Sequence, residues 1–196
     1  QAKTGSGKTA AFALPLLTKL NPRNFAAQAL VLCPTRELAT QVAGEIRRLA
    51  RYQQNIKVVV LCGGQSIGPQ IGSLEHGAHV IVGTPGRIKD HLRKETLSLD
   101  RINTLVLDEA DRMLEMGFID DIKKIFKMVP EEKQCMLFSA TAPKEVKNAL
   151  AALRAKVSNV PVNTQTSPAN GNPATSTLGI SGHCTPSSIS CSMTNI

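Results

Sequence analysis

The stretch Thr104–Asp111 constrains the possible folds of this 196-residue chain more than any other stretch. It reads TLVLDEAD, so a short apolar run ends abruptly in three carboxylates within four positions. A continuous apolar run predicts a strand that is buried on both faces, as in a parallel sheet covered by helices. Ligands of such sheets bind at the carboxyl ends of the strands. We therefore expect Asp108 to emerge at a ligand-binding edge.

The clustered carboxylates have two interpretations. Asp108, Glu109 and Asp111 repel one another unless a positive charge lies nearby, and a hydrated magnesium ion with a nucleotide would supply that charge. Alternatively, the acidic residues cap a helix that runs through Arg112 and Met113. The motifs elsewhere in the chain are needed to separate the two interpretations.

Apolar runs recur along the chain in a unit of strand, turn residues and helix. The first expected helix spans Thr9–Leu20 with a kink at Pro15, and later helices carry their apolar residues on one face. This alternation predicts an α/β fold with a mainly parallel sheet flanked by helices. The expected strands are Ala29–Leu32, Val58–Leu61, Val80–Val82, Thr104–Leu107 and Cys135–Phe138, and the apolar faces are Leu38, Val42, Ile46 and Leu49, then Ile119, Ile122, Phe126 and Val129.

The chain opens on a glycine-rich segment, QAKTGSGKT, at residues 1–9. Such a segment turns backbone N–H groups around a phosphate at a helix N-terminus. Lys8 would then reach the β- and γ-phosphates, and the Thr9 hydroxyl would bind magnesium. Ala2 stands where the generic P-loop pattern has glycine, and a flexible loop is the alternative. Because a P-loop follows a strand and none precedes this one, we expect an N-terminally truncated domain whose sheet has an unpaired edge.

Short distinctive motifs follow the other expected strands, and each has an ordinary structural explanation. Thr35 and Thr84 are suitable helix N-caps, and Pro85 suits a first helical turn. The pair Gly63-Gly64 can simply turn the chain, and the Ser139–Thr141 segment can cap a following helix. These explanations work singly, but they do not account for all the motifs in this order.

The ordered motifs resemble those of the first RecA-like domain of DEAD-box ATP-dependent RNA helicases. The resemblance covers about residues 1–150, and the stretches Ala29–Arg51 and Leu97–Phe118 are most similar to the bacterial DbpA-type branch, which is linked to ribosomal RNA and ribosome assembly. The matching blocks are Ala2–Thr9, Pro34–Ala39 (PTRELA), Gly63-Gly64, Thr84–Arg87 (TPGR), Asp108–Asp111 (DEAD) and Ser139–Thr141 (SAT).

The resemblance implies a P-loop domain that binds ATP and Mg²⁺. Lys8, Asp108 and Glu109 would be the catalytic residues: Asp108 would hold the ion through water, and Glu109 would activate the attacking water. Thr9 would be the second magnesium ligand. The ATP-binding residues would be Ala2, Lys3, Thr4, Gly5, Ser6, Gly7, Lys8 and Thr9.

The resemblance also implies contacts to the sugar–phosphate backbone of one RNA strand, which give affinity without sequence readout. A separate group, Asp111, Ser139 and Thr141, would couple nucleotide to RNA. The RNA-binding residues would be Pro34, Thr35, Arg36, Gly63, Gly64, Thr84, Pro85, Gly86 and Arg87.

Parts of the family pattern are missing from the chain. We expect residues 1–156 to form the helicase ATP-binding domain without its upstream adenine-reading Q motif. We also expect the second RecA-like domain, with its arginine fingers, to be missing. Residues 157–196 contain no Asp, Glu, Lys or Arg and are rich in polar residues, glycine and proline. They predict an irregular, low-complexity tail that is frameshifted, spliced or, alternatively, a linker.

Composition agrees with an anionic partner and a cytoplasmic location. The net charge is +8, tryptophan is absent and aromatic residues make up 3%, which favours contacts to phosphates over base stacking. The five cysteines form no CxxC pair, so reduced thiols in the cytoplasm are the simplest interpretation. His183, Cys184 and Cys191 lack the spacing of a metal site. No membrane-length apolar segment is visible.

Two other functions are alternatives to a helicase. A GTPase is disfavoured because the guanine-reading Asn-Lys-x-Asp motif does not occur in the chain. A non-catalytic RNA-binding module or an inactive fragment stays open as the alternative.

Overall fold

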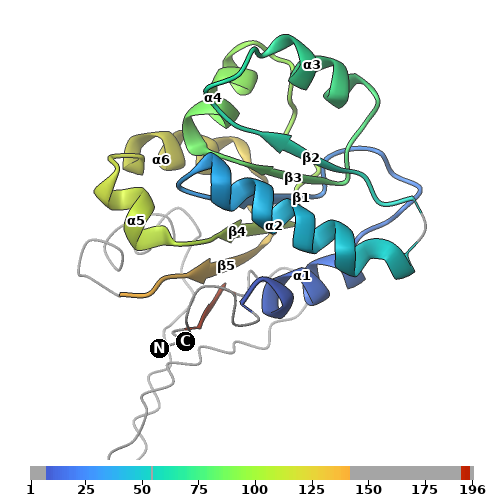
Figure 1. Cartoon of the computed structure of the whole chain (residues 1–196), viewed down its shortest axis with the longest axis horizontal. Helices are drawn as coiled ribbons and strands as arrows, with labels where there is room; N and C mark the ends of the chain where they lie inside the picture. Colours follow the sequence, from blue (N-terminus) through green and yellow to red (C-terminus); the bar gives the residue numbers. More distant parts are fainter. Residues whose placement is uncertain (1–7, 54, 142–190, 195–196) are drawn as a thin grey trace, which may run out of the picture.

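The computed structural model describes residues 8–53, 55–141 and 191–194, and they are built around one parallel sheet (Figure 1). The strand order is β2-β3-β1-β4-β5-β6, and every neighbouring pair is parallel. The predicted parallel sheet is therefore confirmed. The strands are β1 (Ala29–Leu32), β2 (Val58–Leu61), β3 (Val80–Gly83), β4 (Thr104–Leu107), β5 (Gln134–Phe138) and β6 (Cys191–Thr194).

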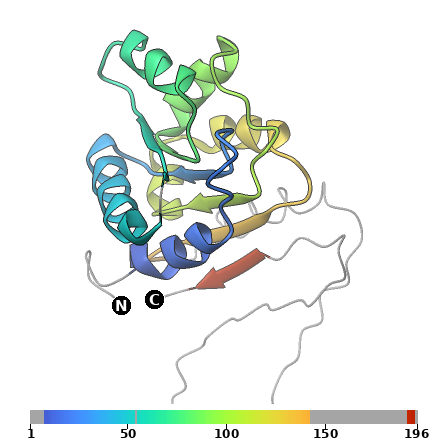
Figure 2. The same ribbon diagram turned by 90° about the vertical axis from the view of Figure 1, so that its right-hand side faces the viewer.

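Helices cover both faces of the sheet, as Figure 2 shows for α2 on one side and α6 on the other. The core on one face is formed by α1 and α2, and the core on the other face by α4, α5 and α6. The described helices are α1 (Lys8–Thr18), α2 (Arg36–Leu49), α3 (Gly68–Glu75), α4 (Pro85–Arg93), α5 (Ala110–Glu115) and α6 (Ile119–Met128), with a 3₁₀ turn, η1 (Ala50–Tyr52).

The central strands are buried along their whole length, which explains their continuous apolar sequences. Every residue of β1, β3 and β4 is buried, whereas the middle of β2 is partly exposed near the edge of the sheet. A strand between two helical layers has no solvent face and so needs no polar alternation. The apolar runs of the sequence predicted these strands to within one residue at each end.

The predicted helix faces are also confirmed. In α2, Val42 and Ile46 are buried, and Leu38 and Leu49 pack partly buried against the same core. The helix begins after Thr35, whose hydroxyl oxygen accepts a hydrogen bond from the backbone N–H of Leu38 at 3.3 Å. Of the stripe predicted for α6, Ile122, Phe126 and Val129, the residue after the helix, pack against the opposite core. Both helices are therefore anchored through one apolar face.

The strand β6 differs from the expectation of an irregular tail and an unpaired sheet edge. Residues 191–194 lie beside β5 in parallel register, with Cys135 opposite Cys191 and Phe138 opposite Thr194. Unpaired backbone groups at a sheet edge accept any extended segment, because the pairing needs no particular side chains. The remaining tail, the boundary at residue 156, His183 and Cys184 lie outside the described residues.

In the described part of the chain, every helix is too short or too polar to cross a membrane.

Candidate nucleotide and RNA site at the carboxyl edge of the sheet

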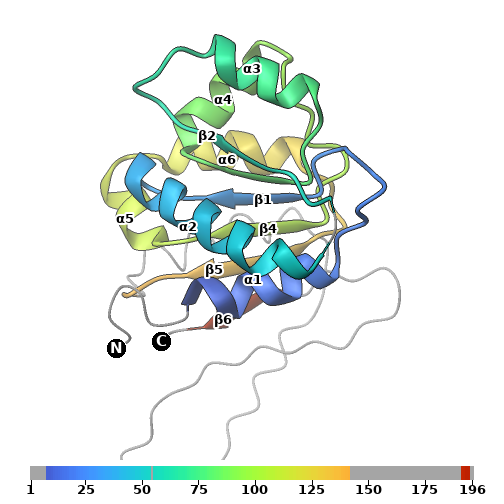
Figure 3. The ribbon, with the colours of Figure 1, turned by 45° about the vertical axis from the view of Figure 1, so that its right-hand side comes forward.

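The strand register brings the predicted site residues to one edge of the molecule. The last residues of β2, β3, β1 and β4 are Leu61, Gly83, Leu32 and Leu107, and they pair level with one another across the sheet. Leu107 pairs with Leu137, the second-last residue of β5. Figure 3 shows the ends of the strands on a single side. Because the order is β2-β3-β1-β4-β5, the loops predicted to bind RNA lie together over β2, β3 and β1. The acidic and SAT motifs lie together over β4 and β5.

Asp108 is held in place directly after β4. Its backbone N–H donates to the carbonyl of Leu32 at 2.9 Å, and the residue is only 6% exposed. Burial, followed by the charge of Glu109, raises the pKa of Asp108 to about 6, although the backbone of Glu109 and the charge of Lys8 act in the opposite direction. No ion pair of Asp108 occurs among the described residues. A bound cation would add to the opposing charge of Lys8 and favour the ionised carboxylate.

Glu109 adopts a left-handed backbone conformation, with φ 51° and ψ 53°, immediately before α5. This conformation is strained for a residue other than glycine, and such strain concentrates at functional sites. The side chain is partly buried and lies 3.5 Å from the guanidinium of Arg112, which is exposed. Glu109 thus occupies the N-cap position of α5, and its side chain pairs with Arg112 on the same helix.

Lys8 and Thr9 form the first described turn of α1, whereas Ala2–Gly7 lie outside the described residues. The charge of Lys8 acts on the pKa of Asp108, which places the two groups within electrostatic reach. Magnesium prefers oxygen ligands and keeps several waters. A threonine hydroxyl and one buried carboxylate fit that preference. No cluster of three or more His, Cys, Asp or Glu side chains suited to a metal exists within the described ranges.

Asp111, Ser139 and Thr141 form one hydrogen-bonded group between β4 and β5. The Asp111 carboxylate accepts from the Thr141 backbone N–H at 2.9 Å and from the Thr141 hydroxyl at 2.8 Å. The Ser139 hydroxyl accepts from the Asp111 N–H at 3.3 Å and donates to the Thr141 carbonyl at 2.5 Å. Burial opposes ionisation of Asp111, but the bonds from Thr141 outweigh it and lower its pKa. The structure therefore brings the three predicted coupling residues together.

The guanidinium of Arg36 lies against Gly64 in the loop after β2. Gly64 has a φ of +76°, and a Cβ at this position would approach the Arg36 Nη1 atom to 3.2 Å. A side chain at position 64 would be strained and would also press on Arg36. Arg36 itself is exposed, while Pro34 is buried and Thr35 is half-buried. Because Gly64 has no side chain, the guanidinium of Arg36 can lie against the backbone of this loop.

Arg87 connects the first turn of α4 to the same loop. One of its guanidinium nitrogens, Nη2, donates to the carbonyl of Gln65 at 2.8 Å. The other, Nη1, is buried and has no hydrogen-bond partner within the described part of the chain. Burial raises the pKa of the Cys62 thiol, while the charges of Arg36 and Arg87 both act to lower it. Two cationic groups therefore flank this loop, and one of them has an unused buried donor.

The residues just before α4 are fixed by the end of β2. The Thr84 backbone N–H donates to the Leu61 carbonyl at 3.1 Å. Gly83 permits this approach, because a Cβ there would lie 2.3 Å from the same carbonyl oxygen. Thr84 occupies the N-cap position as predicted, but its hydroxyl makes no capping bond. Pro85 is buried, Gly86 is half-buried and Gly63 has open space around it.

Several polar residues near this edge were missed by sequence reasoning. Gln70 and His91 are buried, and Lys89 pairs with Asp121 on α6 at 2.7 Å. A signal for His91 did exist, because a helix over residues 85–93 places it on the same face as Ile88 and Leu92.

The parallel sheet, its two helical layers and the acidic motif at a strand end define a RecA-like α/β domain. Residues 1–149 match the family described as DEAD/DEAH box helicase, and the chain belongs to that family.

Similar proteins agree with this assignment. The chain is 58% identical to the ATP-dependent RNA helicase DbpA of Escherichia coli (strain K12) over 162 residues, which cover 83% of the chain and 35% of DbpA. It is 52% identical to the DEAD-box ATP-dependent RNA helicase CshA of Bacillus subtilis (strain 168) over 147 residues, 75% of the chain and 30% of CshA. The predicted likeness to the DbpA-type branch is confirmed. The chain spans about a third of the length of these relatives.

Solved structures show the same fold. A DEAD box protein from Methanococcus jannaschii matches with a TM-score of 0.72 and 50% identity, over 78% of this chain and 41% of that one. Saccharomyces cerevisiae Dbp5, bound to Nup159, Gle1, IP6 and ADP, matches with a TM-score of 0.67 and 34% identity, over 78% and 40%.

Proposed function

We propose that this chain is the ATP- and RNA-binding half of an ATP-dependent DEAD-box RNA helicase, in which ATP hydrolysis is coupled to local unwinding of an RNA duplex. The observation that carries the proposal is the division of one sheet edge into two adjoining parts. The buried carboxylate of Asp108 follows β4 and has no ion pair among the described residues, and two arginines flank the loop after β2. Phosphoryl transfer needs positioning and charge neutralisation, and the first part offers both.

In the nucleotide part, Lys8 would face the β- and γ-phosphates, with Ala2–Gly7 lining the cradle around them. Thr9 and Asp108 would hold Mg²⁺, which neutralises phosphate charge when bound. Glu109 would accept a proton from the attacking water. The ADP named for the yeast structure is in keeping with a nucleotide site on this fold.

In the RNA part, Arg36 and Arg87 would contact phosphates, supported by Gly63, Gly64 and the first turn of α4. Asp111, Ser139 and Thr141 would link this part to the nucleotide, because their hydrogen bonds tie the segment after β5 to α5. Ribosomal RNA as the target and the cytoplasm as the location are part of the proposal, as the family resemblance implies.

Two binding measurements test the proposal on the purified chain. Calorimetry with ATP and Mg²⁺ measures nucleotide affinity, and fluorescence anisotropy with a labelled single-stranded RNA measures RNA affinity. Binding of both supports the proposal. A chain that binds RNA but does not bind ATP would favour a non-catalytic RNA-binding module. A chain that binds neither RNA nor ATP would indicate an inactive fragment.

The Lys8→Ala variant should bind ATP at least about tenfold more weakly, since it loses a charge-assisted contact to the phosphates. Calorimetry with ATP and Mg²⁺ measures the change. Lys124→Ala, which removes an exposed lysine on α6, serves as the control and should bind ATP like the unmodified chain. Equal affinities for Lys8→Ala and the control would contradict the assignment of the P-loop.

The Arg87→Ala variant should reduce the salt dependence of RNA binding. Log affinity should fall steeply with log salt for the unmodified chain, and Arg87→Ala should flatten that slope by about one because one phosphate contact is lost. Anisotropy titrations at several salt concentrations measure the slope. Arg93→Ala, at the exposed end of α4, is the matched control. A salt-independent affinity, or sharp discrimination among single strands of equal length, would count against backbone recognition.

A further inference from the structure

A buried chain of hydrogen bonds joins α4 to the loop that contains Gly63 and Gly64. His91 on α4 is completely buried, and its Nε2 atom lies 3.2 Å from the Oε1 atom of Gln70 on α3. Gln70 is also buried, and its Nε2 atom donates to the carbonyl of Cys62 at 2.9 Å. Cys62 directly precedes the two glycines. The connection therefore runs from one segment of the RNA part to the other through the interior.

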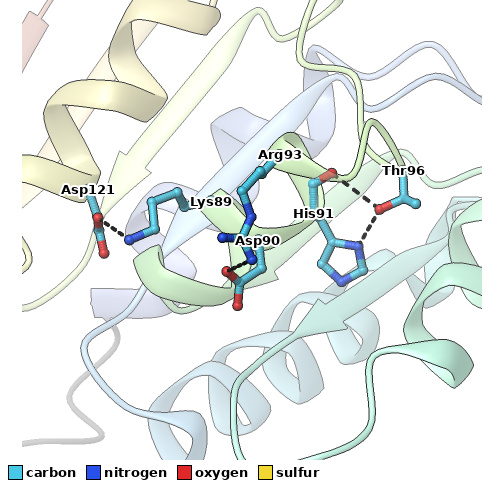
Figure 4. Close-up of polar contacts among 6 residues, drawn as sticks. All are labelled: Lys89, Asp90, His91, Arg93, Thr96 and Asp121. Atoms are coloured by element: carbon cyan, nitrogen blue, oxygen red, sulfur yellow. Dashed lines mark hydrogen bonds and ion pairs between the residues drawn. The ribbon is translucent and has the colours of Figure 1, made fainter.

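The chemistry of the groups fixes the direction of each hydrogen bond. Only the amide nitrogen of Gln70 can donate to the Cys62 carbonyl, so its amide oxygen faces His91. His91 must then carry its proton on Nε2, and its Nδ1 atom accepts from the Thr96 hydroxyl at 2.8 Å (Figure 4). The same hydroxyl lies 3.2 Å from the His91 carbonyl oxygen, so its single proton is shared between these two acceptors. Burial, and then the charge of Arg87, lowers the pKa of His91, in keeping with a neutral ring. Each buried side-chain nitrogen and oxygen of Gln70, His91 and Thr96 therefore has a hydrogen-bond partner among the described residues.

The two ends of this series of hydrogen bonds, His91 and Cys62, are close in sequence to the proposed RNA contacts. Arg87 lies in the first turn of α4, about one helical turn before His91, and Gly64 lies two positions after Cys62. On another side of α4, Lys89 pairs with Asp121 of α6 at 2.7 Å, and Figure 4 shows Lys89 and His91 leaving the helix in different directions. The helix is thus held from two sides. Two contacts join it to the glycine loop: Arg87 donates to the carbonyl of Gln65, and in the interior His91 reaches the Cys62 carbonyl through Gln70.

We propose that Gln70 and His91 are positioning residues for RNA binding, which hold the Gly63-Gly64 loop and the first turn of α4 at the separation that one RNA strand requires. The proposal rests on the proposed RNA-binding function. Apolar side chains of similar size would fill the same space, but they would not set the position of the Cys62 carbonyl. A satisfied buried polar network specifies such a geometry because its bonds are directional.

The Gln70→Met variant tests the proposal, because it keeps nearly the same shape and removes both hydrogen bonds. Measured on the full chain with a labelled ten-nucleotide oligouridylate, RNA affinity should fall about tenfold, as expected for a loosened supporting shell. ATP affinity should stay within about twofold, and the salt slope should be unchanged because no phosphate contact is removed. The conservative His91→Gln variant, which retains an amide donor, should restore most of the affinity lost in His91→Phe.

Each outcome is informative. RNA affinity equal to that of the unmodified chain in Gln70→Met would overturn the inference, as would an equal loss of RNA and ATP affinity, which would indicate general unfolding. If Gln70→Met does not fold, Thr96→Val removes only the hydroxyl next to His91 and should lower RNA affinity alone by a smaller factor. No effect of Thr96→Val would then overturn the inference. Failure of the unmodified chain to bind the oligonucleotide would instead contradict the proposed function.

Discussion

Joined to an upstream Q-motif segment and a second RecA-like domain of the same family, this chain should hydrolyse ATP in the presence of RNA roughly 10³ to 10⁵ times faster than residues 1–196 alone. The family resemblance assigns to the second domain the arginines that stabilise charge on the transferring phosphate. Glu109 supplies a base and cannot replace those charges. The matched region corresponds to 35% of DbpA, so more than half of the relative lies outside it.

A coupled assay of phosphate release, with and without RNA, measures this difference. The isolated chain should show near-background hydrolysis, little stimulation by RNA and negligible duplex unwinding. In the joined protein, Glu109→Gln should abolish the restored activity, since it keeps the shape of the side chain and removes the base. Unwinding of a short RNA duplex by residues 1–196 alone, at rates typical of the family, would show that the chain is not half of an enzyme.

The sequence predicts the fold best for strands that are buried on both faces of the sheet, because their residues are continuously apolar. The runs at β1 and β4 are short and buried along their whole length, and the structure places them in a parallel sheet with the predicted bounds. By contrast, β6 has no apolar pattern that could predict it. It pairs through backbone groups, which any extended segment carries, so composition alone suggests an irregular tail.

The sequence predicts which residues lie near one another at the candidate site, but it does not predict every backbone conformation or buried hydrogen bond there. Parallel strands bring their carboxyl ends to one edge, so Asp108, Ser139 and Arg87 could be expected near one another without coordinates. The left-handed conformation of Glu109 was not predictable, because glycine, asparagine and aspartate are the usual signals for a positive φ. Gln70 and His91 were also missed, since polar residues on a helix are normally solvent-exposed. The apolar neighbours of His91 on α4 indicate its burial, but its bond to Gln70, 21 positions away, does not follow from the sequence pattern.

In the absence of nucleotide and magnesium, Asp108→Asn should make the folded chain more stable at neutral pH by roughly 3 kcal/mol. The pKa of Asp108 rises from its ordinary value of 3.8 to about 6, first because of burial and then because of the charge of Glu109. A carboxyl group whose pKa is raised by folding destabilises the folded state whenever it is ionised there. Asparagine keeps an oxygen acceptor of similar shape and removes the buried charge.

The sign of this effect gives it a characteristic pH dependence. The unfolded chain ionises Asp108 near pH 3.8, so the advantage of Asp108→Asn should be absent below that pH, grow up to about pH 6 and stay constant above it. Denaturant unfolding with EDTA at pH 3.5, 5 and 7.5 measures the difference, and Asp120→Asn on α6, where the side chain is 78% exposed, is the control. Adding Mg²⁺ and ATP should then stabilise the unmodified chain more than Asp108→Asn, because the bound cation compensates the carboxylate. If Asp108→Asn is less stable than the unmodified chain at pH 7.5, or if its stability advantage does not change with pH, the buried carboxylate of Asp108 does not destabilise the folded chain.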